Sequence, residues 1–254
     1  MSDAGKTLVT VATYNEMENL PDLVGQIFQF APDVDILVID DGSPDGTGRW
    51  CDEKSGEDPR VHCIHRQGKL GLGTALVAGM KYAIDHGYRY MLNLDADFSH
   101  QPKYLPDFLA GMEPAGGEPV DVMIGSRYVP GGGIEGWGLK RKFMSRSVNF
   151  YARWSLGLKP KDTSGAFRCY RTALLEKIDF DAVRSRGYSF QEEILWHLKR
   201  AGATFGETPI IFIDRTRGAS KINSKEAVAA LWIIFKLGLQ NWFGRKPRAR
   251  PLAL

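Results

Sequence analysis

The sequence contains few cysteines, and their spacing excludes two common uses of this residue. Its 254 residues include three, Cys51, Cys63 and Cys169, an odd number without a CxxC pair. This pattern argues against a disulfide framework and against a zinc site, and it agrees with a reducing compartment. The first six residues lead directly into a predicted strand, so we expect no signal peptide and a cytoplasmic location.

Several catalytic signatures are also absent. Residues 68–73 (Gly-Lys-Leu-Gly-Leu-Gly) lack the Gly-Lys-Ser/Thr ending of a phosphate loop and the third glycine of a dinucleotide-binding turn. We interpret them as a flexible basic turn before a helix. The five histidines form neither an HExxH motif nor a triad-like group, and His62, His86 and His197 are interpreted as structural.

Charge is distributed unevenly along the chain. Hydrophobic residues make up 43% and charged residues 25%, which is ordinary for one large α/β domain, with or without an appendage. The net charge is +3, but residues 215–254 contain nine Lys or Arg and a single acid, Glu226. This basic end indicates a phosphorylated ligand or an anionic surface near the C-terminus, or a solvated tail.

Strands and helices alternate over residues 7–95. Buried strands are predicted at 7–12, 34–39, 61–65 and 90–95, with helices between them. Such β-α-β alternation predicts a mostly parallel sheet with helices on both faces. Ligands of such sheets bind at the carboxyl ends of the strands.

The predicted strand at 90–95 ends in two carboxylates, Asp95 and Asp97, one residue apart. In an extended chain the side chains at i and i+2 point to the same side, so both acids can face one point. Two hard, anionic oxygen ligands suit Mg²⁺ or Mn²⁺, which also takes oxygens from substrate phosphates. The alternative is a polar loop with two solvated acids.

Cationic side chains follow a predicted strand in the second half of the chain. The strand at 120–125 delivers Arg127 to the same edge, and the glycine-rich segment 130–136 is predicted as a mobile loop. Arg141 and Arg146 follow on a segment that turns helical. Their position after a flexible loop favours a phosphate-binding role as much as a solvated helix face.

The remaining polar segments are also expected at ends of strands or helices. Residues 162–168 are predicted as a loop–strand junction, and a helix is expected to end at Arg200. A last strand at 209–213 leads into a basic, glycine-containing loop at 214–221, which is suited to folding over an anion.

Residues 227–243 are predicted as a C-terminal helix. They are apolar except for Lys236, Gln240 and Asn241, and at 17 residues they fall short of the about 20 that a membrane-spanning helix needs. Two tryptophans, a basic face and an arginine-rich tail are typical of a helix that lies in a membrane interface. The alternative is an amphipathic helix packed on the core.

Taken together, these motifs resemble the inverting nucleotide-sugar glycosyltransferases of family two, and within that family the dolichol-phosphate (polyprenol-phosphate) mannosyltransferases. The likeness extends in order along the chain to about residue 221 and is specific only as a set. It is carried by Ala12-Thr13-Tyr14-Asn15-Glu16, Asp40-Asp41-Gly42-Ser43-Pro44-Asp45-Gly46-Thr47, Asp95-Ala96-Asp97, Gly125-Ser126-Arg127-Tyr128, Gly165-Ala166-Phe167-Arg168, Gly187-Tyr188-Ser189-Phe190-Gln191, and Asp214-Arg215 with Ser220-Lys221.

The resemblance implies a GT-A fold, an α/β nucleotide-binding domain over residues 1–221, followed by a C-terminal amphipathic helix and basic tail at 222–254. It also implies a set of site residues. Tyr14, Glu16 and Asp41 would bind guanosine and ribose, with the backbone at Ala12 and Ile39 lining the pocket. Asp95 and Asp97, with Ala96 between them, would hold Mg²⁺ or Mn²⁺ against the diphosphate. Arg127, Arg215 and Lys221 would neutralise phosphates, and Arg141 or Arg146 would bind the lipid phosphate.

Two positions depart from the family pattern. Ala12 stands where the family usually has proline, which loosens the first turn but leaves Tyr14 and Glu16 in place. Ser99 stands where glutamine is frequent, and a serine reaches less far toward a metal ion. We therefore keep Ser99 only as a candidate nucleotide-sugar contact.

The implied reaction transfers mannose from GDP-mannose to dolichyl or polyprenyl phosphate with inversion. Asp97, Arg127 and Arg215 are the candidate catalytic residues. A phosphate acceptor is already anionic and needs no strong base, whereas a sugar hydroxyl would need one, for which Glu192 or Glu193 is available. The missing Gln-x-x-Arg-Trp pattern argues against a polysaccharide synthase.

Two rival functions remain open. One is a polyprenol-phosphate glucosyltransferase that uses UDP-glucose, and the other is a non-catalytic nucleotide-sugar-binding subunit at a membrane. For all three we expect a peripheral protein at the cytoplasmic face of a membrane, with no nucleic-acid partner.

Overall fold

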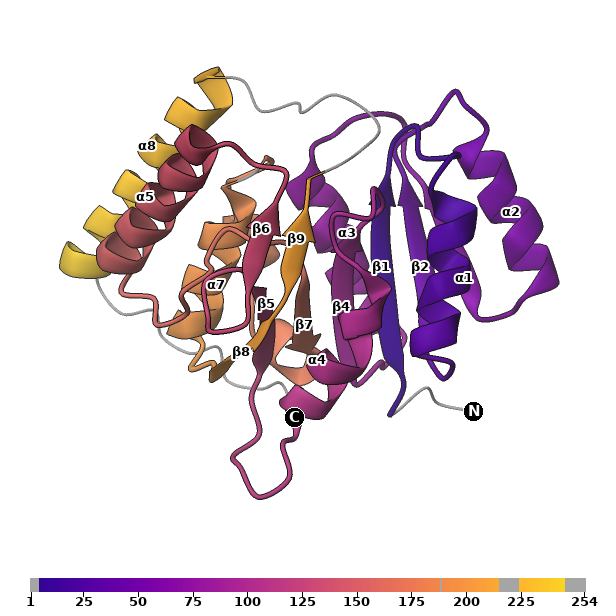
Figure 1. Cartoon of the computed structure of the whole chain (residues 1–254), viewed down its shortest axis with the longest axis horizontal. Helices are drawn as coiled ribbons and strands as arrows, with labels where there is room; N and C mark the ends of the chain where they lie inside the picture. The colour runs from indigo at the N-terminus through magenta and orange to yellow at the C-terminus, as the bar shows by residue number, and fades with distance from the viewer. Residues whose placement is uncertain (1–4, 188, 215–223, 245–254) are drawn as a thin grey trace.

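The computed structural model describes residues 5–187, 189–214 and 224–244 of the chain (Figure 1). A seven-stranded sheet runs through the molecule in the order β3-β2-β1-β4-β7-β5-β8. Its neighbours pair in parallel except at β7, which is antiparallel to both β4 and β5. The strands are β1 (Thr7–Thr13), β2 (Asp35–Asp40), β3 (Val61–His65), β4 (Tyr90–Asp95), β5 (Val122–Ser126), β7 (Arg168–Arg171) and β8 (Phe205–Pro209).

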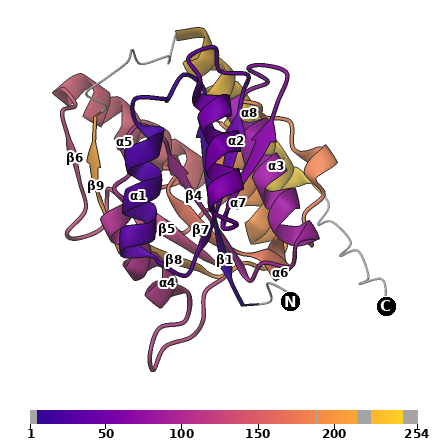
Figure 2. The ribbon, with the colours of Figure 1, turned by 90° about the vertical axis from the view of Figure 1, so that its right-hand side faces the viewer.

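Helices cover both faces of the sheet, as the sequence predicted, and Figure 2 shows α1 and α3 on opposite sides. The face with α1 holds α1 (Leu20–Phe30), α2 (Thr47–Glu57) and α4 (Leu105–Met112). The other face holds α3 (Leu72–Asp85), α5 (Leu139–Leu156), the short α6 (Thr172–Leu175), α7 (Phe190–Arg200) and α8 (Ser224–Phe243). Two 3-10 turns lie at Pro102–Tyr104 and Phe180–Ala182.

Strand β1 shows how the sequence builds both layers. Its side chains alternate, so Leu8 packs into the core beside α3 while Val9 and Val11 pack into the core beside α1. A strand buried on both faces is a nearly continuous apolar run, and this run is the feature of the sequence that predicted β1. Pro21 lies in the first turn of α1, where its missing N–H costs no hydrogen bond.

In the second half of the chain one prediction was wrong and one strand was missed. The predicted mobile loop 130–136 contains a short strand, β6 (Gly133–Glu135), which pairs in parallel with β9 (Ile211–Ile213). Strand β8 was not anticipated, because it is only half-buried and contains Gly206 and Glu207 instead of an apolar run. Both pairings join segments far apart in sequence, which local patterns do not encode.

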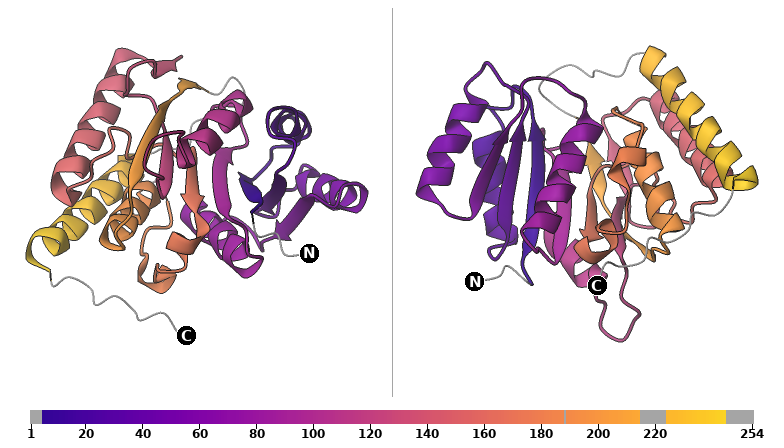
Figure 3. Two further views of the ribbon diagram at one scale, coloured as in Figure 1. Left: turned by 90° about the horizontal axis from the view of Figure 1, so that it is seen from below. Right: turned by 180° about the vertical axis from the view of Figure 1, so that it is seen from behind.

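Helices α5 and α8 lie side by side at the end of the molecule away from α2, as all views agree (Figures 1 and 3). Ile234 and Leu237 of α8 are buried in the core, and the Trp242 indole N–H donates to the carbonyl of Ser155 at 2.9 Å. This packing shows that one side of the helix docks on the core, as in the alternative, while Leu231, Trp232 and Phe235 stay exposed on it. A domain boundary at residue 221 stays a prediction, because residues 215–223 lie outside the described part.

Among the described residues, no helix combines the length and the apolar character that spanning a bilayer requires.

Candidate active site

The sequence-predicted site residues of the first three motifs meet at the carboxyl ends of β1, β2 and β4. The strand register places Ala12 directly between Ile39 on one side and Asp95 on the other. Tyr14 and Asp41 follow immediately after the ends of β1 and β2. The structure therefore brings together three segments that the sequence presents as separate motifs.

The acidic turn begins where β4 ends: Asp95 is the last residue of the strand, and Asp97 already lies in the turn. Asp95 and Asp97 are partly exposed while Ala96 between them is buried, so the two carboxylates lie on the open side. One Asp97 oxygen accepts the Ser99 N–H at 3.1 Å. Phe98 has a φ of 59°, an uncommon conformation for a residue with a side chain. Such backbone strain is typical of functional turns.

His100 is a residue of this turn that the sequence analysis missed. Its buried ring accepts the Asp95 N–H at Nδ1 (3.2 Å) and lies against Phe167 and Phe212. Burial lowers the pKa of His100, outweighing the attraction of Asp95 and Asp97, so the ring is neutral. A neutral ring that accepts at Nδ1 orients the backbone of Asp95. The sequence carried no signal for this role beyond the position next to the acidic pair.

The two carboxylates fit a hard divalent cation, since both offer anionic oxygens on the open side. Asp95 and Asp97 are the residues that would hold it. The prediction for Ser99 needs correction. Its side chain is only 2% exposed, behind the turn, because its N–H and C=O are bonded to Asp97 and Ile213, and it does not face the open side.

The loop after β1 is held by the loop after β2. The N–H of Asn15 donates to the Ser43 hydroxyl at 2.9 Å, and the N–H of Glu16 donates to the Thr47 hydroxyl at 3.1 Å. Asn15 has a φ of 59°, which turns the chain sharply between Tyr14 and Glu16. This network gives Tyr14 and Glu16 a defined position at the sheet edge.

Lys69 belongs to the same edge, although the sequence analysis interpreted residues 68–73 only as a turn. Its ammonium lies 3.5 Å from the centre of the Tyr14 ring, a cation–π contact. Gly71, with a φ of 99°, precedes α3, so the segment does begin a helix as expected. The contact between the Lys69 ammonium and Tyr14 was missed, because it forms only when the fold brings these two residues together.

Asp41 is paired in the structure. The Arg66 guanidinium donates to both Asp41 oxygens, at 2.6 and 3.0 Å, and both side chains are largely buried. Arg66 follows β3 directly, so this ion pair ties the ends of β2 and β3 together. Any contact of Asp41 with a ligand therefore shares its oxygens with Arg66.

Arg127 lies where the sequence placed it, directly after β5, but its guanidinium is bound within the protein. It donates from Nε and Nη2 to the two oxygens of Asp162, at 2.6 and 2.7 Å, and is 8% exposed. Burial favours the neutral carboxyl, but the charge of Arg127 outweighs it and lowers the pKa of Asp162. The expected direct contact of Arg127 with a phosphate is thus replaced, in this structure, by a buried ion pair.

A basic pocket of about 370 Å³ adjoins this ion pair. Among the described residues, four cations and no acid line it: Arg127, Arg146, Arg153 and Lys161. Arg141 points elsewhere, with its guanidinium 2.8 Å from Asp214 and 3.9 Å over the Trp137 ring. Arg215 and Lys221 lie outside the described residues.

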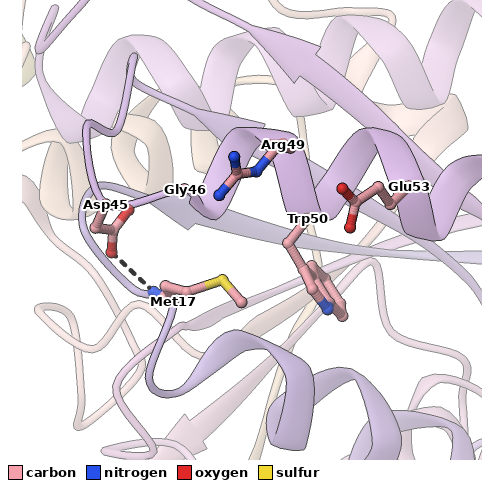
Figure 4. Close-up of a pocket in the computed structure, with 6 residues that line it drawn as sticks. All are labelled: Met17, Asp45, Gly46, Arg49, Trp50 and Glu53. Carbon is pink, nitrogen blue, oxygen red and sulfur yellow. Dashed lines mark hydrogen bonds between the residues drawn. The ribbon is translucent and has the colours of Figure 1, made fainter.

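A second cavity, of about 360 Å³, opens between the β1–α1 loop and α2 (Figure 4). Asp45 at its rim accepts the Met17 N–H at 3.0 Å, and Trp50 forms part of its wall. Neither carboxylate of the acidic turn lines it. This cavity is therefore separate from the candidate chemistry.

The two glutamates considered as bases are both inside the protein. Glu193 accepts the N–H groups of Arg184 and Ser185 at 3.0 and 2.7 Å, which holds the preceding loop. Glu192 is buried, and this burial raises its pKa to about 7 despite the nearby Arg168. Neither carboxylate faces an open site, so the hydroxyl-acceptor alternative loses its base.

The resemblance implies a phosphate acceptor, which is already anionic and needs no base, so we expect Glu192→Gln to leave sugar transfer within about threefold of wild type. Stability should change instead. Because the pKa of Glu192 is raised from 4.5 to about 7, the contribution of this residue to stability is greatest below pH 4.5 and falls by up to about 3 kcal/mol between pH 4.5 and 7. Urea unfolding of both proteins between pH 4.5 and 8 measures this slope. A variant that keeps the slope, or that loses transfer, would contradict the assignment.

Residues 8–179 match glycosyl transferase family 2, so this chain belongs to that family and is a glycosyltransferase. Two relatives align along nearly the whole chain. The polyprenol monophosphomannose synthase of Mycolicibacterium smegmatis is 43% identical over 246 residues, covering 96% of this chain and 90% of the relative. The undecaprenyl-phosphate mannosyltransferase of Micrococcus luteus is 40% identical over 244 residues, covering 96% and 98%.

Solved structures confirm the GT-A-like fold. Glucosyl-3-phosphoglycerate synthase of Mycobacterium tuberculosis, in complex with Mn²⁺, UDP and glucosyl-3-phosphoglycerate, has a TM-score of 0.63 at 16% identity, covering 93% of this chain and 80% of that chain. The mannosyltransferase PcManGT of Pyrobaculum calidifontis, in complex with GDP-Man and Mn²⁺, has a TM-score of 0.58 at 13% identity, covering 96% and 66%.

Proposed function

We propose that this glycosyltransferase transfers mannose from GDP-mannose to a polyprenyl phosphate such as dolichyl or undecaprenyl phosphate, with inversion. The observation that supports it most is the presence of both an acidic turn and a basic pocket that no acid lines in the part of the chain that the structure describes. Relatives named for polyprenol-linked mannose transfer, at 40–43% identity, agree with this acceptor. The mannosyltransferase crystallised with GDP-Man supports the donor.

The donor would lie along the carboxyl ends of β1, β2 and β4. Tyr14, Glu16 and Asp41 would contact the nucleoside over the backbone of Ala12 and Ile39, and Lys69 joins them through its contact with the Tyr14 ring. Arg215 and Lys221 would neutralise the diphosphate. Arg66 holds the Asp41 carboxylate in a fixed orientation, and this carboxylate is a suitable acceptor for the N–H groups of a nucleobase.

Asp95 and Asp97 would bind Mg²⁺ or Mn²⁺, with His100 holding the turn. When bound, such a cation offsets the negative charge of the departing nucleoside diphosphate. The acceptor phosphate is already anionic at neutral pH, so it attacks the anomeric carbon in line without a base and inverts the configuration. The chain's own work is to orient both phosphates and to keep water away from the sugar.

The acceptor phosphate would bind beside Arg127, with Arg141 and Arg146 as its two candidate contacts. Arg146 lines the basic pocket that Arg127 also lines. Arg141 lies over Trp137, the ring that Arg127 also approaches at 5.7 Å. The variants Arg141→Ala and Arg146→Ala distinguish the two candidates. The variant that raises the KM for the acceptor without changing the KM for the donor identifies the residue that contacts the acceptor phosphate.

The acceptor is a lipid, and the paired helices supply a surface for reaching it. Of the large apolar side chains exposed in the described part of the chain, all but Phe30 and Leu70 lie on α5 and α8. The rings of Trp154 on α5 and Trp242 on α8 lie 6.0 Å apart, so the two helices share one apolar face. This face consists of Leu139, Phe143, Met144, Phe150, Trp154, Leu231, Trp232, Phe235, Leu239, Trp242 and Phe243.

We propose that this apolar face, together with the basic tail, rests on the cytoplasmic surface of a membrane. Phe143→Ser combined with Trp232→Ser is expected to weaken sedimentation with anionic liposomes several-fold. Transfer to a long-chain polyprenyl phosphate should fall more than transfer to a short, water-soluble one. Phe30→Ser, at the exposed end of α1, is the matched control. Equal losses with both acceptors would contradict a membrane role for the face.

A transfer assay tests the function directly. Radiolabelled GDP-mannose and UDP-glucose are each supplied with a polyprenyl phosphate and Mg²⁺ or Mn²⁺, and the lipid product is counted. We expect product from GDP-mannose. Product from UDP-glucose alone would establish the rival glucosyltransferase, and the absence of product with both donors would favour a non-catalytic binding subunit.

A further inference from the structure

A second group of metal-ligand side chains lies on the edge strand of the sheet, away from the acidic turn. Cys63 and His65 are two residues apart on β3, so both point toward α2, which supplies Asp52. The His65 Nε2 atom lies 2.7 Å from an Asp52 oxygen and 3.5 Å from the Cys63 sulfur. One donor atom from each residue lies within 4.8 Å of both others.

The three side chains converge on one point, and they are not arranged as a proton relay. In a Cys-His-Asp triad the two ring nitrogens serve different partners, one the nucleophile and one the carboxylate. Here Asp52 and Cys63 both approach the same nitrogen, Nε2. A single nitrogen has one lone pair or one proton, so it does not pass a proton from the thiol to the acid along this line.

We propose that Asp52, Cys63 and His65 bind a transition-metal ion of the Zn²⁺ type, through a single cysteine and not through the paired cysteines whose absence from the sequence argued against a zinc site. Thiolate, imidazole and carboxylate are the three ligand types that Zn²⁺ prefers. In a tetrahedral site with ordinary bond lengths, the sulfur and nitrogen ligands stand about 3.5 Å apart, which is the separation of Cys63 and His65. The nitrogen and oxygen need to move apart by only about 0.6 Å.

The surroundings suit such an ion. The side chains of His65 and Asp52 are 47% and 63% exposed, so the ion has access from solvent and water completes the fourth position. Gly48 leaves room for the imidazole: a Cβ there would lie 3.3 Å from Nδ1 of His65 and 3.0 Å from an Asp40 oxygen.

The ion would tie α2 to the edge strand and so stabilise the part of the sheet that carries Arg66. That residue follows His65 and holds Asp41. This site differs in chemistry from the acidic turn, which offers oxygen ligands alone. The proposal stands without the proposed function, because its evidence is the donor set on α2 and β3.

Cobalt binding tests it on the full-length, reduced protein. Co²⁺ is titrated in excess Mg²⁺, which competes for oxygen-only sites, and the near-ultraviolet sulfur-to-cobalt charge-transfer band is followed. We expect one equivalent to produce the band, and Zn²⁺ to displace it. Zn²⁺ should also raise the melting temperature by several degrees.

Variants decide which residues are responsible. Cys63→Ser should abolish the band, and His65→Gln and Asp52→Asn should weaken Co²⁺ binding by more than about tenfold. His62→Gln, on the opposite side of the same strand, and Asp97→Asn, in the acidic turn, should leave it unchanged. A band that survives Cys63→Ser, or no band at one equivalent in the folded wild-type protein, would overturn the proposal. Far-ultraviolet circular dichroism confirms that each variant is folded.

Discussion

Asp97→Asn is expected to lower the rate of sugar transfer about 10³-fold, or about 4 kcal/mol of transition-state stabilisation. The substitution keeps the size of the side chain and one oxygen that can still accept the Ser99 N–H. It removes the negative charge that would hold a divalent cation beside the diphosphate. Because Asp97 lies partly exposed on a turn, the melting temperature should stay within a few degrees of wild type.

Asp107→Asn is the matched control, since Asp107 is an exposed acid of the nearby helix α4 and borders neither the turn nor the basic pocket. Initial rates at saturating Mn²⁺ are compared for the three proteins, and donor affinity is measured with and without the metal ion. A variant Asp97→Asn that transfers mannose at the wild-type rate with the metal chelated would show that the acidic turn has another purpose.

Asp162→Asn is expected to reduce the free energy of unfolding by about 3–5 kcal/mol at neutral pH. The side chain is fully buried and meets Arg127 through two short hydrogen bonds. Neutralising it leaves a guanidinium enclosed by protein without a compensating charge, next to the Tyr128, Trp137 and Phe212 rings. Transfer should fail as well, because the wall of the basic pocket loses its support.

The same ion pair predicts a pH dependence. The pKa of Asp162 is lowered in the folded protein, because Arg127 outweighs the effect of burial. Its contribution to stability is therefore present above the ordinary aspartate pKa of about 4 and is lost as the pH falls through the lower folded value. Asp162→Asn should lack this contribution at every pH.

The surface pair Asp58–Arg60 provides the comparison, since Arg60 is well exposed. Asp58→Asn should cost no more than about 1 kcal/mol. Urea unfolding at several pH values measures both variants. Similar small losses at Asp58 and Asp162 would mean that burial of the Arg127 pair contributes little, and that Arg127 is free to serve a ligand.

Much of the first half of the site could be predicted because its signals are local. The apolar run of β4 placed Asp95 and Asp97 at the carboxyl end of this strand, and the β-α-β order brought Tyr14 and Asp41 to the same edge. His100 and Lys69 escaped prediction for the opposite reason. Their roles depend on contacts with the backbone of Asp95 and the ring of Tyr14, which no spacing rule identifies.

The sequence by itself determined the parallel half of the sheet, the acidic turn and the family. These depend on residues close in the chain, where apolar alternation and short motifs carry the information. Only the tertiary structure decided that Arg127 pairs with Asp162 and that α5 joins α8 in one apolar face. The same holds for the meeting of Asp52 with Cys63 and His65. Each of these depends on how distant segments pack, and the choice among possible partners is made by burial and charge in the folded protein.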